Sequence, residues 1–430
     1  MPALALMMST GSALAAPAQV PGQGSPLACT NGTIYAIQRG DTDSVLYAVD
    51  TTTINSATVL DTPVATLPGE TVPNALGISP GGAAAYTVHQ LTGPSDTTVP
   101  LYAYNPLTQT WTTYTGTAGP NQNLIAGAVD PANGIYYYAD YSSGTALIYG
   151  FDTATNTAIP GIIATVPLPI PGGFNGDIAF DAAGNLYLLG GTTTTAGITV
   201  VPGPLPTTGS ATGTPLQGKL LQTVNGFQFN GIAFDNSGNL FLNFTQPSDP
   251  NSYLEEVNPN TGAVIAGPTP HSATGQPLVD LGACSLNPSL TLQKDIVKRA
   301  ERRDQFMLSI TGDDLPPTTA TTTGKTTGLQ PVIAGPAIGH AGTTYTFTET
   351  AVSGDLDNYR TSYTCVEKPS GTVIAHGKGD SFTLTLPAAA TPGPSVVCTF
   401  KNKAERNHGK HHHRKPKRCH GRRELRCREH

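Results

Sequence analysis

Short apolar runs alternate with turn residues along most of the chain, and these runs recur. One run ends on an aromatic residue about every fifty positions: Tyr35, Tyr86, Tyr137, Tyr187 and Phe241. A second run precedes it, as in residues 176–181 (GDIAFD), and a third follows it, as in residues 46–50 (LYAVD). A stretch rich in Thr and Val closes each unit. This period predicts four short strands per repeat.

Four strands in about fifty residues, repeated radially, are typical of a β-propeller blade. The turn sequence at 181–185 (DAAGN) supplies Gly and Asn, which adopt positive φ at low cost. The first unit lacks its leading strand, and residues 277–284 supply a matching one at the far end. We therefore predict an all-β fold with a five-bladed β-propeller over residues 29–287. Pairing of strand 277–284 beside strand 33–38 would close the ring and leave no open edge.

A second domain is expected over residues 288–402. Its apolar positions alternate with period two in six segments: 290–299, 304–312, 344–349, 359–366, 381–386 and 396–400. Roughly seven strands in about 115 residues predict a β-sandwich.

The net charge of −6 conceals a strong asymmetry. Between Cys29 and Asn287 the only cations are Arg39 and Lys219, so we expect no nucleic-acid binding at the propeller. Residues 403–430 are instead basic, and we expect a disordered tail there. Two more specific functions are alternatives for the tail: contact with anionic polymers, or metal capture. The residues that would carry them are His411, His412, His413, Arg414 and Lys415.

The N-terminus indicates export. Residues 1–16 combine an apolar stretch with a small-residue cleavage site and predict a signal peptide, followed by a linker over 17–28. The basic segment of a signal is missing, so the recorded start could lie inside the true signal. No run of eighteen apolar residues follows this segment, so the sequence predicts no transmembrane segment. We expect a secreted or extracellular protein, with association at the cell surface as an option.

Six cysteines fit an oxidising compartment. Sequence alone allows 15 pairings. The expected pairs are Cys29–Cys284, Cys365–Cys398 and Cys419–Cys427.

The repeats with the pattern GIAFDxxGNL(Y/F) resemble the blades of the NHL-repeat, gluconolactonase and streptogramin-lyase propeller superfamily. The resemblance covers residues 29–287 and implies the blade fold without any particular activity. The whole arrangement is similar to secreted bacterial surface proteins of unassigned function.

The second domain resembles the prealbumin-like domains of bacterial adhesins and pilin stalks. The segments that carry this resemblance are LTLQK at 290–294, DQFMLSITG at 304–312, YTFTET at 345–350 and CTFKN at 398–402. In some relatives a Lys, an Asn and an acid form an intramolecular isopeptide bond, and Lys294, Asn402 and Glu349 occupy comparable strands here. The simpler interpretation, which we favour from the sequence alone, makes Lys294 a solubilising charge on a strand edge.

Candidate catalytic groups are scarce in the propeller, which holds three Glu and two His: Glu70, Glu255, Glu256, His89 and His271. The repeated acids Asp130, Asp181 and Asp235 fall at turns, so we expect them to cap hairpins rather than bind metal. Trp111 and the blade tyrosines are expected to pack in the core rather than form a sugar platform.

Two classes of function remain. We predict a non-enzymatic recognition or adhesion protein without catalytic, cofactor-binding or metal-binding residues; Ca²⁺ is the one ion kept as an option. Its propeller would bind an extracellular glycan or protein, and its sandwich would serve as a stalk. The alternative is a metal-dependent propeller hydrolase or lyase, similar to lactonases or streptogramin lyases.

Overall fold

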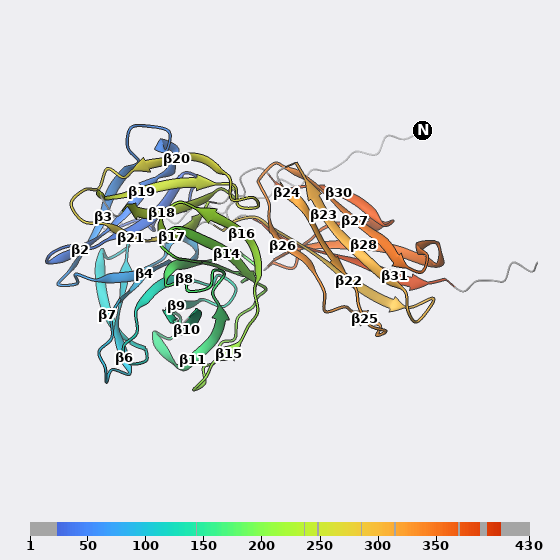
Figure 1. The fold of residues 1–430 in the computed structure, drawn as a ribbon, viewed down its shortest axis with the longest axis horizontal. Coiled ribbons are helices and arrows are strands. Elements are labelled where there is room, and N and C mark those ends of the chain that lie inside the picture. Colours follow the sequence, from blue (N-terminus) through green and yellow to red (C-terminus); the bar gives the residue numbers. More distant parts are fainter. Residues whose placement is uncertain are drawn as a thin grey trace, which may run out of the picture.

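The structure, a computed structural model, describes residues 24–405 apart from 143, 236, 247–248, 285, 314, 369 and 388–393. The predicted signal segment and most of the basic tail, including Cys419 and Cys427, lie outside the described residues. An N-terminal group of twisted sheets and a C-terminal sandwich lie beside each other (Figure 1). The described chain is almost entirely β, interrupted by three short 3₁₀ turns: η1 (Thr51–Thr53), η2 (Pro80–Gly82) and η3 (Leu356–Asn358).

Five antiparallel sheets make up the N-terminal region. The first contains β21 (Leu278–Gly282), β1 (Thr33–Gln38), β2 (Asp43–Asp50) and β3 (Leu60–Pro68). The second contains β4 (Pro73–Ile78), β5 (Ala85–His89), β6 (Thr98–Asn105) and β7 (Thr110–Thr117). The third contains β8 (Leu124–Val129), β9 (Ile135–Ser142), β10 (Thr145–Asp152) and β11 (Thr157–Pro167), to which the short β15 (Thr214–Pro215) adds in parallel.

The last two sheets of this region follow the same order. The fourth contains β12 (Asn175–Phe180), β13 (Leu186–Gly191), β14 (Thr195–Val201) and β16 (Lys219–Asn225). The fifth contains β17 (Gln228–Phe234), β18 (Leu240–Gln246), β19 (Asp249–Val257) and β20 (Val264–Pro270). Each sheet begins with a buried strand, and these first strands pack against one another. The region is therefore propeller-like.

The first sheet is completed by the end of the region, as predicted. β21 pairs antiparallel with β1, and Tyr35 lies opposite Gly282. A disulfide joins Cys29 to Cys284 beside this pairing, across a sequence separation of 255 residues. The last strand of the region is therefore held in the first sheet by backbone hydrogen bonds and by a covalent bond.

The repeated aspartates cap turns, which confirms the expected role. The Asp181 carboxylate accepts hydrogen bonds from the Ala183 and Asn185 amides at 2.9 and 3.0 Å. Asp235 accepts from Ser237 and Asn239 in the same way, and Asp130 accepts from Ala132. Most blade tyrosines are core residues as expected, and Tyr35, Tyr136, Tyr137, Tyr138 and Tyr187 are at most 1% exposed. Trp111 packs against the core but is only partly buried, as are Tyr102 and Tyr114.

The C-terminal region is a two-sheet sandwich with more strands than the seven predicted. One sheet has the order β25 (Gly328–Leu329), β22 (Ser289–Lys298), β31 (Ser395–Ala404), β28 (Tyr359–Lys368) and β29 (Val373–Lys378), with β26 (Ala334–Ile338) also paired to β22. The other has the order β24 (Leu315–Thr321), β23 (Gln305–Gly312), β27 (Thr344–Ser353) and β30 (Ser381–Thr385). A disulfide joins Cys365 and Cys398, which lie opposite each other on β28 and β31.

The sandwich rests on the fifth sheet of the propeller-like region. The Asn260 side chain donates to the Ile338 carbonyl at 3.0 Å, and the Ala341 amide donates to the Ser237 carbonyl at 2.9 Å. Ile338 is fully buried among apolar residues of the fourth and fifth sheets. Ile338 of the sandwich therefore packs into the core of the propeller-like region, while the sandwich keeps a core of its own.

Candidate functional sites

The innermost strands meet at a pair of buried carboxyl groups that sequence reasoning did not single out. Asp177 lies on β12 and Asp280 on β21, and both are 0% exposed. Their side chains hydrogen-bond to each other. The only signal in the sequence was an acid inside a strand that is otherwise apolar.

Backbone amides from all five innermost strands donate to this pair. Asp177 accepts from Gly127 on β8, Ile178 on its own strand and Ile232 on β17. Asp280 accepts from Leu76 on β4 and from Leu281 on its own strand, both at 2.8 Å. The pair therefore ties the five first strands together.

Burial is the main cause of the shift in the pKa of both acids. It raises the pKa of Asp177 to about 7, against opposing hydrogen bonds from Asp280 and backbone amides. Burial and the neighbouring Asp177 raise the pKa of Asp280 well above its ordinary value. The pair thus retains a proton under conditions in which an exposed aspartate has lost it.

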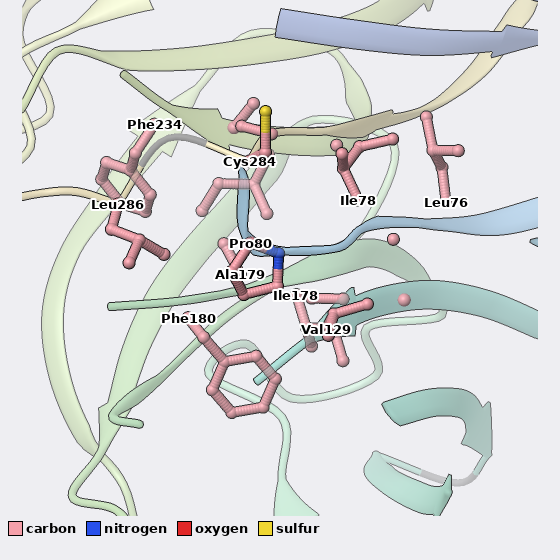
Figure 2. A pocket seen from close by; sticks show the side chains of 17 residues that line it. Leu76, Ile78, Pro80, Val129, Ile178, Ala179, Phe180, Phe234, Cys284 and Leu286 are labelled. Atoms are coloured by element: carbon pink, nitrogen blue, oxygen red, sulfur yellow. The ribbon is translucent and has the colours of Figure 1, made fainter. Parts of the chain in front are cut away.

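A small cavity lined by apolar side chains lies among the same five strands (Figure 2). Ile78, Val129, Ile178, Phe180 and Phe234 are among the side chains around it. Its volume is about 20 Å³, enough for about one water molecule. It offers no room for a sugar or a lactone.

A second polar cluster links the first two sheets. Glu70, in the connection between β3 and β4, accepts a hydrogen bond from Tyr102 at 2.7 Å and contacts His89 Nδ1 at 3.0 Å. Burial by itself raises the pKa of Glu70, but hydrogen bonds from Tyr102, His89 and the Val72 amide together hold it below its ordinary value. The His89 side chain is 34% exposed, so this is an oriented histidine that solvent can reach.

No metal centre is seen in the part of the chain that the structure describes. Residues 24–405, with the gaps given above, contain no group of three or more His, Cys, Asp or Glu side chains placed to hold an ion. The calcium option from the sequence remains an untested prediction. The described residues also contain no helix long and apolar enough to cross a membrane.

The sandwich encloses the three residues named from the pilin resemblance. Lys294 on β22 and Asn402 on β31 are 0% exposed, and Glu349 on β27 of the facing sheet is 1% exposed. The sequence interpretation of Lys294 as a strand-edge charge is therefore wrong. Period-two alternation places Lys294 on the inner face of β22, and the facing sheet covers it.

These three side chains contact one another inside the apolar core. Lys294 Nζ lies 2.6 Å from Glu349 Oε1, and Asn402 Nδ2 donates to the same oxygen at 3.0 Å. Lys294 pairs with Phe400 and Ile296 with Asn402 across the parallel strands β22 and β31, so Lys294 and Asn402 share a face two residues apart. Lys294 Nζ also lies 4.9 Å from the centre of the Phe306 ring. Glu349 thus bridges an amine and a carboxamide held on neighbouring strands.

Burial shifts both ionisable groups toward their neutral forms. It lowers the pKa of Lys294 to about 8, although the nearby Glu349 opposes this. Burial also raises the pKa of Glu349, against the effect of Lys294. A neutral amine is a nucleophile, and a carboxyl group whose pKa is raised by burial can take up a proton from it and pass it on.

The remaining site residues from the sequence fall in the tail. His411, His412, His413, Arg414 and Lys415 lie outside the described residues, as do Cys419 and Cys427. Their roles stay predictions.

Comparison with known proteins identifies the second domain. Residues 289–404 match the family model of the prealbumin-like fold domain, and β22 to β31 make up that part of the chain. No curated protein matches the sequence. The chain therefore combines a propeller-like N-terminal region with a prealbumin-like C-terminal domain.

Solved structures also match the chain, among them these three. A functionally unknown protein from Desulfotomaculum acetoxidans is 16% identical, over 71% of this chain and 89% of that chain, with a TM-score of 0.34. A protein from Lactobacillus plantarum is 12% identical, over 85% and 99%, with a TM-score of 0.31. The major pilin of Streptococcus pyogenes is 15% identical, over 46% and 84%, with a TM-score of 0.20.

Proposed function

We propose that this is a non-enzymatic recognition or adhesion protein, secreted or held at the cell surface. The propeller is the binding head and the prealbumin-like domain is its stalk. The observation that supports this most is the buried cluster of Lys294, Glu349 and Asn402. Two disulfides and the prealbumin-like family match fit an extracellular location.

The cluster is suited to forming an isopeptide bond within the stalk. The neutral Lys294 amine attacks Cγ of Asn402, and Glu349 carries a proton from Nζ to the departing Nδ2. The new bond joins Nζ to Cγ, the Cγ–Nδ2 bond breaks, and ammonia leaves. No oxidant or cofactor is needed.

Such a bond would serve a stalk because of the strands it joins. β22 is the first strand of the domain and β31 is the last. A pulling force applied at the two ends of the domain would pass through the covalent bond before it reached the sheet hydrogen bonds.

Intact-mass measurement of the folded full chain tests this step. After reduction of the disulfides, we expect the mass to be lower than the sequence mass by one ammonia, and peptide mapping to find residues 294 and 402 on one branched peptide. The variants Lys294→Arg, Asn402→Ala and Glu349→Ala should have the full mass. Lys298→Ala is the matched control, because Lys298 lies on the same strand but is exposed, and it should keep the loss. A folded wild-type chain of full mass would overturn the proposal.

For the head, we propose that the five sheets form one complete five-bladed ring. Supporting this are the order of the sheets along the chain, the pairing of β21 with β1 and the Cys29–Cys284 disulfide. Electron cryomicroscopy of the full chain should resolve five blades, and a sixth would contradict the proposal.

The ligand of the head is proposed to be an extracellular glycan or protein. A glycan and protein binding array probed with the full chain tests this. Specific capture that survives the Glu70→Gln change would favour recognition without catalysis.

One observation favours the alternative, a propeller hydrolase or lyase. The Glu70–His89 pair orients an imidazole, which is what a general base requires. Turnover of a sugar lactone or a streptogramin that is abolished by a chelator and by His89→Gln would replace the non-enzymatic proposal.

The basic tail is proposed to contact anionic polymers. The full chain should bind immobilised heparin and elute at moderate salt, because such contacts release counterions. Truncation after Glu405 should abolish this retention, whereas unchanged retention would refute it.

A further inference from the structure

The centre of the propeller-like region holds two acids where one charge at most can be accommodated. Asp177 and Asp280 are fully buried and hydrogen-bonded to each other. A carboxylate can only accept a hydrogen bond, so a bond between two carboxyl groups requires a proton on one of them. Two negative charges in contact in an apolar interior would repel strongly.

The surroundings are arranged for one negative charge and one proton. Five backbone amides, one from each innermost strand, donate to the four carboxyl oxygens. Such donors stabilise a carboxylate, but none of them can accept the proton that the pair must keep. At the positions of β4, β8 and β17 that align with Asp177 in the repeat, the chain carries the small residues Ala75, Ala126 and Gly231.

We propose that Asp177 and Asp280 share a single proton at the ring centre, and that this proton makes closure of the propeller sensitive to pH. When the proton is lost, two charges remain at the point where all five first strands are tied together. Loss of the proton therefore weakens the ring at its centre, where the first strands meet, rather than at the outer strands of the sheets. Acid conditions keep the head closed, and alkaline conditions loosen it.

Few other titratable groups act on the pair. β4, β8 and β17 carry no Asp, Glu, His, Lys or Arg, and β12 and β21 carry only the two acids themselves. On the strands behind, Tyr136 and Tyr141 interact with both acids, and burial raises the pKa of each tyrosine well above its ordinary value. Asp140 accepts from the Asn123 amide, and His89 is held by Glu70.

The direction of the effect follows from the raised pKa values. Unfolded aspartates release their protons near the ordinary value of 3.8, whereas the pKa of Asp177 is about 7 in the fold and that of Asp280 is higher still. The folded state therefore binds more protons than the unfolded state above about pH 4. This stabilisation is complete below that pH and is lost as the pH rises through the folded pKa values. For each extra proton that the folded state binds, the folding equilibrium constant falls about tenfold for every unit by which the pH rises.

Urea denaturation of the full chain, monitored by tyrosine fluorescence at pH values from about 5 to about 9, tests the proposal. We expect the midpoint of the propeller transition to fall steadily with pH. In Asp280→Asn the amide donates to Asp177 without a titrating proton, so the fall should flatten. Asp41→Asn, which removes an exposed acid of the same region, should behave as the wild type does.

Infrared spectroscopy supplies a second measurement, independent of how well the variants fold. The wild type should show the stretching band of a protonated carboxyl group at neutral pH, and the band should vanish at high pH. Asp280→Asn should show a weaker band, since only the contribution of the Asp177–Asp280 pair is removed and the buried Glu349 is unchanged. Absence of the band from the folded wild type, or the same pH dependence in wild type and Asp280→Asn, would overturn the proposal.

Discussion

At the scale of single residues, burial rather than residue type decides what the charged groups of this protein do. Lys294 sits in an alternating strand like any surface lysine, yet it is enclosed with Glu349 and Asn402. Asp152 and Asp181 both follow blade strands, but Asp152 caps an exposed turn and Asp181 a buried one. The same side chain therefore has different consequences at different depths.

Removing Lys294 tests how much the buried Glu349 carboxyl destabilises the sandwich when no amine lies beside it. Lys294→Met removes the cross-link and also leaves the Glu349 carboxyl buried with no amine beside it; we expect the unpaired carboxyl by itself to cost about 3–5 kcal/mol of the unfolding free energy of the sandwich. Lys294→Met with Glu349→Gln should recover much of it. Both variants lack the cross-link, so their difference in chemical denaturation reports the charge alone. Equal stability of the two would contradict the argument.

At the scale of elements, the turns between first and second strands are fixed by aspartate side chains. Asp181 accepts from two backbone amides and from the Asn185 side chain at 2.7 Å. The hairpin between β12 and β13 therefore depends on the Asp181 carboxylate as the acceptor of these hydrogen bonds.

Asp181→Ala should weaken the fourth sheet. Buried donors left without an acceptor cost about 1–3 kcal/mol in total stability, and we expect a loss of that size in urea denaturation. Asp152→Ala is the matched control: it removes a similar cap at an exposed turn, where water can take over, and should cost much less. A larger effect at Asp152 would refute the role of burial.

At the scale of the whole molecule, the two ends of the propeller-like region are joined to each other. β21 completes the first sheet, and the Cys29–Cys284 disulfide spans a separation of 255 residues. The chain-entropy account gives long loops the larger stabilisation, about 5 kcal/mol for one of this length.

Replacing both Cys29 and Cys284 by Ser should lower the stability of the propeller by about that amount, measured by denaturation without reductant. The control replaces Cys365 and Cys398, whose separation is 33 residues, and should affect the sandwich transition instead. Loss of the sandwich transition in the Cys29/Cys284 variant would show that the regions do not unfold separately, contrary to this expectation.

The sequence by itself determined the repeats, the turns, the closing strand and the period-two strands of the second domain. Each strand and turn is a pattern of residues close together in the chain, so its spacing is readable without coordinates. The closing strand could be inferred because the first unit lacks its leading strand and residues 277–284 match it. The expected disulfide pairs Cys29–Cys284 and Cys365–Cys398 are also those present in the structure.

Only the tertiary structure decided which polar groups meet. Lys294, Glu349 and Asn402 come from three strands of two facing sheets, and period-two alternation says which face a residue takes but not whether another sheet covers it. Asp177 and Asp280 come from the fourth and the first sheet, and no local pattern brings them together. They meet because the first strands of the five sheets pack against one another, and burial and mutual contact there change the chemistry of both acids.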